Sequence, residues 1–140
     1  MDELEIARQS ARAMYATDAA VRELGIDVEV TGPGRAEAHL DIRAEMINGH
    51  DVCHGGYLFT LADTAFAYAC NSYNRVTMAA GASIEFLRPA RLGDRIAATA
   101  TEVHRGGRTG FYDVRLTNQD GVDIAIFRGR SHGTDAVFFS

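Results

Sequence analysis

Residues 56–73 read GYLFTLADTAFAYACNSY, an apolar run long enough for about five turns of α-helix. Apolar residues occupy nearly every helical position of this run, instead of the single stripe that is typical of a surface helix. A helix that is apolar all round is expected to be buried all round. The sequence therefore predicts one central, buried helix, which starts after the loop from Ala44 to Gly55.

Strand-like segments flank this helix on both sides. Ile26, Val28 and Val30 alternate with polar residues before a Gly32-Pro33-Gly34 turn, so residues 26–43 are predicted to form a hairpin. Four more segments follow the helix, at about residues 76–87, 94–105, 108–118 and 122–133. Short turns join most of them, which is typical of an antiparallel sheet. A long sheet that curls around one buried helix satisfies both patterns, so the predicted class is α+β.

Two further helices are predicted before the first strand. Residues 3–16 place Leu4, Ala7, Ala11 and Met14 on one side of an amphipathic helix. Asp18 is then expected to cap a short second helix that ends at Gly25.

Composition limits the possible classes of function. The chain of 140 residues has the size of one domain, residues 1–140, and 46% of it is hydrophobic. Its formal net charge of −5 argues against capture of a nucleic-acid backbone. The longest apolar stretch contains Asp63 and is too short to span a bilayer. With two cysteines and an acidic start in place of a signal peptide, the chain is expected to be soluble and cytoplasmic.

Asp63 is the first candidate for a functional side chain, because apolar residues surround it in the central helix. No Lys or Arg is spaced to pair with it along the helix. A carboxylate in an apolar setting costs several kcal/mol unless something compensates, so a catalytic or ligand-binding role is favoured. The alternative is that Asp63 lies on a small exposed strip, or accepts a bond from Thr60 or Thr64.

The second candidate is His54-Gly55-Gly56, where the central helix begins. Glycines at this point let another molecule approach the free N–H groups of the first turn, and the helix dipole favours negative charge there. The segment could therefore stabilise a developing oxyanion. The alternative is an ordinary glycine turn before a helix.

The spacing of these two candidates implies a second subunit. Gly55 and Asp63 are eight positions apart, about 12 Å along a helix, so one substrate carbonyl cannot touch both within a single chain. Two antiparallel helices across a two-fold axis would set Gly55 of one beside Asp63 of the other. We therefore expect a homodimer with two equivalent shared sites.

Other polar clusters carry weaker signals. His50, Asp51, Cys53 and His54 match no standard zinc spacing, so no metal site is expected. Arginines gather at turns and strand ends, where they are either solvated charge or ligands of a phosphorylated molecule such as coenzyme A. These are Arg88, Arg91, Arg95, Arg105, Arg108, Arg128 and Arg130.

Several of these motifs together resemble the PaaI type of hotdog-fold acyl-CoA thioesterase, which is found in phenylacetate degradation. The resemblance covers most of the chain, up to about His132. The matching residues are Asn48-Gly49-His50, Cys53-His54-Gly55-Gly56, Leu61–Ala67, Ile84–Pro89, Gly93-Asp94 and Ala125–Gly129. The resemblance implies a curved antiparallel sheet around a long central helix, assembled into dimers and usually into tetramers.

The resemblance also implies roles for individual residues. Asp63 would act as general base toward water or as nucleophile on the thioester carbonyl, while the Gly55 N–H of the partner subunit would polarise that carbonyl. Asn48 would position the attacking water or the thioester, and His54 would orient groups by hydrogen bonding. The residues expected to contact the substrate are Gly56, Phe66, Arg88 and Arg128.

Three hypotheses of function follow. The first is hydrolysis of acyl-CoA, with aryl-acetyl thioesters such as phenylacetyl-CoA and hydroxyphenylacetyl-CoA preferred and no cofactor beyond the coenzyme A of the substrate. The second is a hotdog dehydratase that acts on 3-hydroxyacyl thioesters. The third is a non-catalytic acyl-CoA-binding protein. Asn48 and the His-Gly-Gly sequence favour hydrolysis over dehydration, and a buried acid argues against a pure binder.

Overall fold

A computed structural model describes all 140 residues of the chain. In chain order the elements are α1 (Glu3–Tyr15), α2 (Ala19–Leu24), β1 (Asp27–Gly32), β2 (Arg35–Asp41), the 3₁₀ turn η1 (Ala44–Met46), α3 (Gly55–Cys70), β3 (Thr77–Phe86), β4 (Arg95–Gly106), β5 (Thr109–Thr117) and β6 (Asp123–Gly133). Each predicted helix and strand is present, with ends that differ from the prediction by a few residues.

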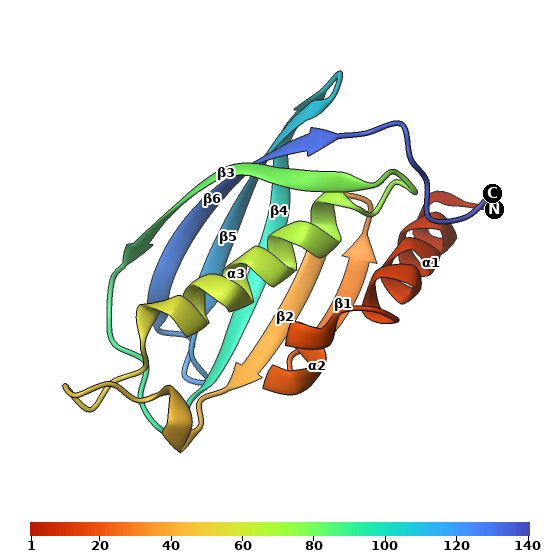
Figure 1. Ribbon diagram of the computed structural model, residues 1–140. Coiled ribbons are helices and arrows are strands. Elements are labelled where there is room, and N and C mark those ends of the chain that lie inside the picture. The colour runs from red at the N-terminus through yellow and green to blue at the C-terminus, as the bar shows by residue number, and fades with distance from the viewer.

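The six strands form one antiparallel sheet in the order β1-β2-β4-β5-β6-β3. The sheet curves around α3, which crosses its concave face (Figure 1). This arrangement confirms the predicted α+β hotdog fold. The strand β3, which follows α3 in sequence, pairs only with β6, so the main-chain groups along its other side are free.

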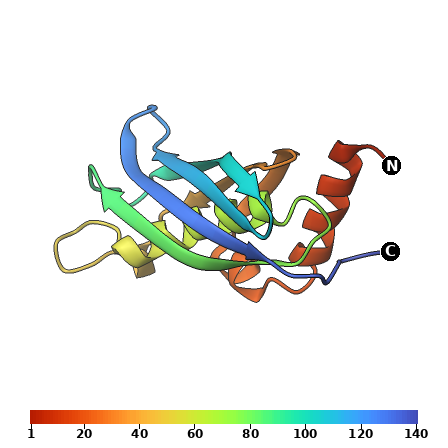
Figure 2. The ribbon, with the colours of Figure 1, turned by 90° about the horizontal axis from the view of Figure 1, so that it is seen from above.

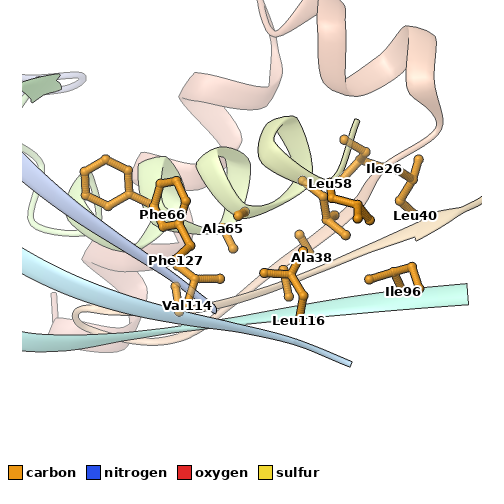
Figure 3. Packing of buried hydrophobic residues seen from close by; sticks show 14 of the residues in the cluster. Ile26, Ala38, Leu40, Leu58, Ala65, Phe66, Ile96, Val114, Leu116 and Phe127 are labelled. Carbon is orange, nitrogen blue, oxygen red and sulfur yellow. The ribbon is translucent and has the colours of Figure 1, made fainter. Parts of the chain in front are cut away.

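Small side chains let α3 lie close to the sheet. Buried alanines on β2 and β4 stand opposite each other as the register pairs Ala36–Ala100 and Ala38–Ala98. We call these four residues the alanine floor. On the helix, Ala62, Ala65 and Ala69 are fully buried. Larger residues fill the core on either side of this contact, among them Leu58, Leu116 and Phe127 (Figure 3).

The prediction that the central helix is buried on every side is wrong for one strip. Gly56 and Phe59 are exposed, and Thr60, Asp63 and Ala67 are half-buried. Spacings of three and four residues put these positions on one face of α3, which the rest of the chain leaves uncovered. We call these five residues the open strip. A run that is apolar all round is therefore compatible with a helix that the single chain covers on only three sides.

Helix caps fix the N-terminal helices. The Asp2 side chain accepts a hydrogen bond from Glu5 N at the start of α1, and Asp18 accepts one from Val21 N at the start of α2. As predicted, α2 stops at Gly25, which has a left-handed φ of 67°.

Both chain ends lie near α1, and the loop before α3 lies at the opposite end of the molecule (Figure 2). None of the helices has the length and apolar character that crossing a membrane requires.

Candidate active site

Asp63 lies on the open strip of α3, half-buried and without a cationic partner. None of the seven ion pairs in the chain includes it. Neither threonine predicted as an alternative partner donates to it, because Thr60 Oγ1 bonds Gly56 O and Thr64 Oγ1 bonds Thr60 O. Burial raises the pKa of the Asp63 carboxyl above its ordinary value of 3.8. The group is thus an uncompensated acid that water can reach.

Asp18 is a neighbour of Asp63 that sequence reasoning missed. Its negative charge is the second cause that raises the pKa of Asp63. Asp18 is held toward α3 by the hydroxyl of Tyr68, which donates to Asp18 Oδ2 at 3.1 Å. Asp18 and Asp63 are 45 positions apart, so only the tertiary structure, in which Asp18 meets Tyr68 of α3, reveals this relationship.

The N-terminus of α3 presents free main-chain donors. His54 is the N-cap residue, but its side chain makes no capping hydrogen bond, and the first turn contains no acidic residue. The N–H groups of Gly55 and Gly56 have no acceptor in the chain. Nothing lies within 4 Å of the position that a Cβ on Gly56 would occupy, so this side of the helix end is open. These N–H groups can donate hydrogen bonds to an anion or to a polarised carbonyl oxygen.

Asn48 organises the loop that leads to this helix end. Its side-chain Oδ1 accepts hydrogen bonds from His50 N at 2.8 Å and from Val52 N at 3.3 Å. The oxygen is therefore committed to the loop, and the side-chain NH₂ has no acceptor in the chain. Any contact of Asn48 with a ligand must use that NH₂ group as a donor.

The two halves of the candidate site are separated in the single chain. Gly55 and Asp63 lie on the same helix, about 12 Å apart along its axis. The structure thus retains the separation that the sequence predicted. One small reacting group cannot contact both residues of the same chain.

Phe66 does not lie on the open strip. Its ring is fully buried against Tyr112 and Phe127, and it fills the space beside Gly129. It belongs to the core between α3 and the sheet, so it reaches no open surface of the chain. The most exposed aromatic side chain of α3 is that of Phe59, which packs edge-to-face on Phe127.

The two arginines predicted to bind substrate lie in different places. Arg88 follows β3 and donates to Asp123 O; two residues on, Ala90 O accepts from Cys53 N, so this loop lies at the N-terminal end of α3. Arg128 instead projects from the outer, convex side of the sheet, where it makes two hydrogen bonds with the Asp113 carboxylate. The sheet separates Arg128 from α3.

The His and Cys side chains of the loop before α3 do not converge on one point. His50, Asp51 and His54 are exposed, whereas Cys53 is buried. No group of three or more His, Cys, Asp or Glu side chains in the chain is placed to hold a metal ion.

Comparison with known proteins places this arrangement among thioesterases. Residues 50–125 match the family model of the thioesterase superfamily. The chain is 49% identical over 124 residues, 89% of each sequence, to the acyl-coenzyme A thioesterase PaaI of Escherichia coli. The structure of the E. coli PaaI protein from the phenylacetic acid degradation operon superposes with a TM-score of 0.94 at 46% identity, covering 97% of this chain and 99% of that one.

Two structures with lower sequence identity have a similar fold. A mutant of the phenylacetic acid degradation protein PaaI from Thermus thermophilus gives a TM-score of 0.78 at 34% identity, over 82% of this chain and 98% of the other. A hypothetical thioesterase from Streptococcus pneumoniae, solved with coenzyme A, gives 0.75 at 26% identity, over 80% and 90%.

Proposed function

Because the chain belongs to the thioesterase superfamily and is an acyl-CoA thioesterase of the PaaI type, we propose that it hydrolyses aryl-acetyl thioesters such as phenylacetyl-CoA and hydroxyphenylacetyl-CoA. Water cleaves the bond between the carbonyl carbon and the sulfur, which releases the free aryl acid and coenzyme A. The observation that carries this proposal is the uncompensated acid Asp63 on the open strip of a helix whose N-terminal amides are unpaired.

The preference for an aromatic acyl group is supported by two observations. The E. coli and T. thermophilus relatives are both assigned to phenylacetic acid degradation. In this chain, the exposed ring of Phe59 lies one helical turn from Asp63 and is backed by Phe127. An aryl ring bound there would make edge or offset contacts with Phe59, which are favourable beyond the area they bury.

Asp63 acts on the thioester carbonyl in one of two ways. As a general base it takes a proton from the attacking water, and that proton passes to the coenzyme A thiolate as the C–S bond breaks. As a nucleophile it displaces the coenzyme A thiolate to form an acyl anhydride, which water then hydrolyses to the free acid and the aspartate carboxylate. Both routes need the ionised carboxylate. Its raised pKa makes that carboxylate a better base than an exposed aspartate.

The N-terminus of α3 receives the carbonyl oxygen. The Gly55 N–H, with Gly56 N–H beside it, donates to the oxygen as negative charge develops on it, and the helix dipole stabilises the same charge. Asn48 donates from its free NH₂ group to the attacking water or to the thioester. His54, exposed at the N-cap, orients the substrate by hydrogen bonding.

The complete site is shared between two subunits. Because Asp63 and Gly55 of one chain are about 12 Å apart, the carbonyl contacts Asp63 of one subunit and Gly55 of its partner. The free edge of β3 supports this assembly: its ten residues are mostly exposed, including Met78 and Phe86, and their main-chain groups on one side are unpaired. Pairing of two β3 edges about a two-fold axis would bring two open strips together. Two such dimers are then expected to form a homotetramer.

The test is release of coenzyme A from a panel of thioesters. The panel contains phenylacetyl-, hydroxyphenylacetyl-, benzoyl-, acetyl- and medium-chain acyl-CoA, with wild type and Asp63→Asn assayed in parallel. We expect aryl-acetyl esters to be preferred and the variant to lose at least ~10²-fold in kcat. Preference for another acyl group would overturn the proposed substrate class. Turnover that survives in the variant would overturn the role of Asp63.

Mixed dimers test the shared site. Gly55→Pro removes one N–H at a helix position where proline is tolerated, and Phe86→Ala in the same chain makes room for the ring. Neither this double variant nor Asp63→Asn should turn over substrate alone. Unfolding and refolding the two together should restore activity, because half of the hybrid dimer's sites then contain both wild-type groups. No recovery in hybrids confirmed by mass spectrometry would refute the shared site.

A further inference from the structure

Two loops of the chain share one hydrogen-bond pattern. The first comprises residues 48–52 before α3, and the second comprises residues 118–122 between β5 and β6. Each begins with an asparagine whose main-chain N–H donates to the carbonyl of the fifth residue and whose carbonyl accepts from the N–H of the fourth. The asparagine Oδ1 accepts from the N–H groups of the third and fifth residues. We call them the Asn48 loop and the Asn118 loop.

The two loops differ at their second residue. Gln119 is tied to the start of β4, because its Oε1 accepts from Arg95 N at 3.0 Å and its Nε2 donates to Asp94 Oδ1 at 2.9 Å. Gly49 is exposed, and nothing lies within 4 Å of the position that a Cβ would occupy. Its backbone also lacks the left-handed φ that favours glycine. Neither conformation nor packing therefore requires a glycine at position 49.

The Asn48 side chain is folded over the Gly49 peptide group. Its Oδ1 accepts from His50 N at 2.8 Å, which closes an Asx turn around that peptide. The Gly49 N–H donates to no acceptor in the chain, so no hydrogen bond withholds this nitrogen from reaction. The turn thus keeps the side-chain carbonyl carbon of Asn48, Cγ, next to a main-chain nitrogen that no side chain covers.

The hydrogen bonds of the Asn48 loop also favour attack on Cγ. Addition of a nitrogen to this carbon places negative charge on Oδ1, and the N–H groups of His50 and Val52 already donate to that oxygen. The side-chain NH₂ group has no acceptor in the chain and is reached by water, so its departure breaks no contact. The electrophile, the nucleophile and the leaving group are therefore all in place.

We propose that Asn48-Gly49 is a site of spontaneous deamidation, in which the Gly49 nitrogen attacks Asn48 Cγ. The new N–Cγ bond closes a succinimide ring, while the Cγ–Nδ2 bond breaks and ammonia leaves with the Gly49 amide proton. Water then opens the ring. Its attack at Cγ gives aspartate, whereas its attack at the main-chain carbonyl gives isoaspartate, in which the main chain runs through the former side chain.

Both products lack the NH₂ donor that the proposed function assigns to Asn48. Aspartate keeps an oxygen for His50 N and Val52 N, so deamidation to this product should reduce kcat at least ~10-fold, as Asn48→Asp does. Isoaspartate also adds a carbon to the main chain, which disrupts the loop that leads to the N-terminus of α3. The loss of activity rests on the proposed function, whereas the modification itself does not.

Ageing of the purified protein at physiological pH and temperature tests the proposal. Peptide mass spectrometry measures the conversion of Asn48 and of Asn118 separately, and an isoaspartyl methyltransferase labels any isoaspartate. We expect Asn48 to convert to a mixture of the two acids, and kcat to fall in proportion to the fraction converted. Isoaspartate is the decisive product, because direct hydrolysis of the side-chain amide by water gives aspartate alone.

Exchange of the second residue between the two loops provides matched variants. Gly49→Gln creates the Asn-Gln pair of the Asn118 loop and should slow conversion of Asn48 at least ~10-fold, because a side chain on the attacking residue hinders ring closure. Gln119→Gly should make Asn118 a second site of conversion. Both rates are measured under conditions in which thermal unfolding shows the variants to be folded.

Intact Asn48 after prolonged ageing would overturn the proposal, and so would equal conversion rates of Asn48 in wild type and Gly49→Gln. Conversion that left kcat unchanged would overturn the loss of activity, and with it the donor role of Asn48 in the proposed function. If wild type hydrolysed no thioester, the proposed function would fail, and the mass measurements would still decide whether Asn48 deamidates.

Discussion

The ring of Phe86 fills the space beside Gly55: its Cζ atom lies 2.7 Å from the position that a Cβ on Gly55 would occupy. Phe86 is the last residue of β3, so the contact links the free edge of the sheet to the first residue of α3. A side chain at position 55 would have to displace the exposed ring of Phe86, an effect that is separate from any role of the Gly55 N–H group. Its neighbour Gly56 has no such contact, which allows the two roles to be separated.

We expect Gly55→Ala to destabilise the protein by about 1–3 kcal/mol, because the new methyl group meets the Phe86 ring. Adding Phe86→Ala should recover part of that loss, a coupling that a double-mutant cycle in urea measures. Gly56→Ala is the control and should not destabilise the protein, because a Cβ there meets no other atom and alanine has the higher helix propensity. Equal stability of the two single variants would contradict the role assigned to Phe86.

Asp63→Asn should raise thermal stability at neutral pH, although it removes activity. The pKa of Asp63 is higher in the folded than in the unfolded state, so ionisation of this group weakens folding as pH rises above 3.8. The difference in Tm between variant and wild type should therefore shrink on acidification. Asp113→Asn should behave in the opposite way, because Arg128 lowers the pKa of Asp113 and stabilises its ionised form. Both Tm series need one fixed protein concentration.

Asp18→Asn should move the acid limb of the kcat/KM profile to lower pH. The negative charge of Asp18 raises the pKa of Asp63, and an asparagine can still accept the Tyr68 hydroxyl. If Asp63 has the proposed role, this limb reports its ionisation in the free enzyme. Asp113→Asn, which makes the same change of charge on the outer face of the sheet, should leave the limb in place. A limb that is identical in wild type and Asp18→Asn would mean that Asp18 does not tune the catalytic acid.

Asn48→Asp and Asn48→Ala should distinguish the loop-forming role of the side-chain oxygen from the proposed ligand-binding role of the NH₂ group. Aspartate keeps an oxygen for His50 N and Val52 N but loses the NH₂ donor, so we expect a normal Tm and a kcat reduced at least ~10-fold. Alanine also leaves both main-chain donors without an acceptor, which should cost about 1–2 kcal/mol of stability. A fully active Asn48→Asp would restrict Asn48 to its loop-forming role.

The two cysteines should not react with thiol reagents in the native protein. Cys53 and Cys70 are buried, and desolvation raises the pKa values of their thiols to about 11 and about 12. At pH 8 a disulfide reagent should titrate no fast thiol until denaturant is added, when it should titrate both. Rapid reaction of either native thiol would show that local opening exposes it. Because the protein thiols do not react, the same reagent can be used to follow the release of coenzyme A.

Local sequence patterns predict the fold well because each helix and strand has an unambiguous hydrophobic period or a clear turn at its end. Alternation marked β1 and β2, turn residues separated the later strands, and a continuous apolar run marked α3. The end of α3 was placed three residues too late. The cause is tertiary: the Asn71 side chain bonds Ala67 O and also both Thr77 N and Thr77 O, which turns the chain toward β3. No local signal distinguishes that asparagine from a helical one.

The site was less predictable because its residues are defined by what surrounds them. Asp63 stood out because no cation was spaced to pair with it, and the structure confirms that it has none. Phe66 and Phe59 look alike in sequence, but the fold buries Phe66 completely and leaves Phe59 exposed. Strand pairing brings Asp113 to Arg128, and the Tyr68 hydroxyl holds Asp18 near Asp63. Contacts of that kind leave no mark on the local sequence.

The alanine floor places a constraint on how such a protein can diverge. The depth at which α3 sits, and with it the position of Asp63 and of the helix N-terminus, depends on the four methyl groups of Ala36, Ala38, Ala98 and Ala100. A larger residue at any one of them would lift the helix unless a facing residue shrank in the same lineage. We therefore expect accepted substitutions in this layer to arise as compensating pairs. The geometry of catalysis would then be inherited through residues that never meet the substrate.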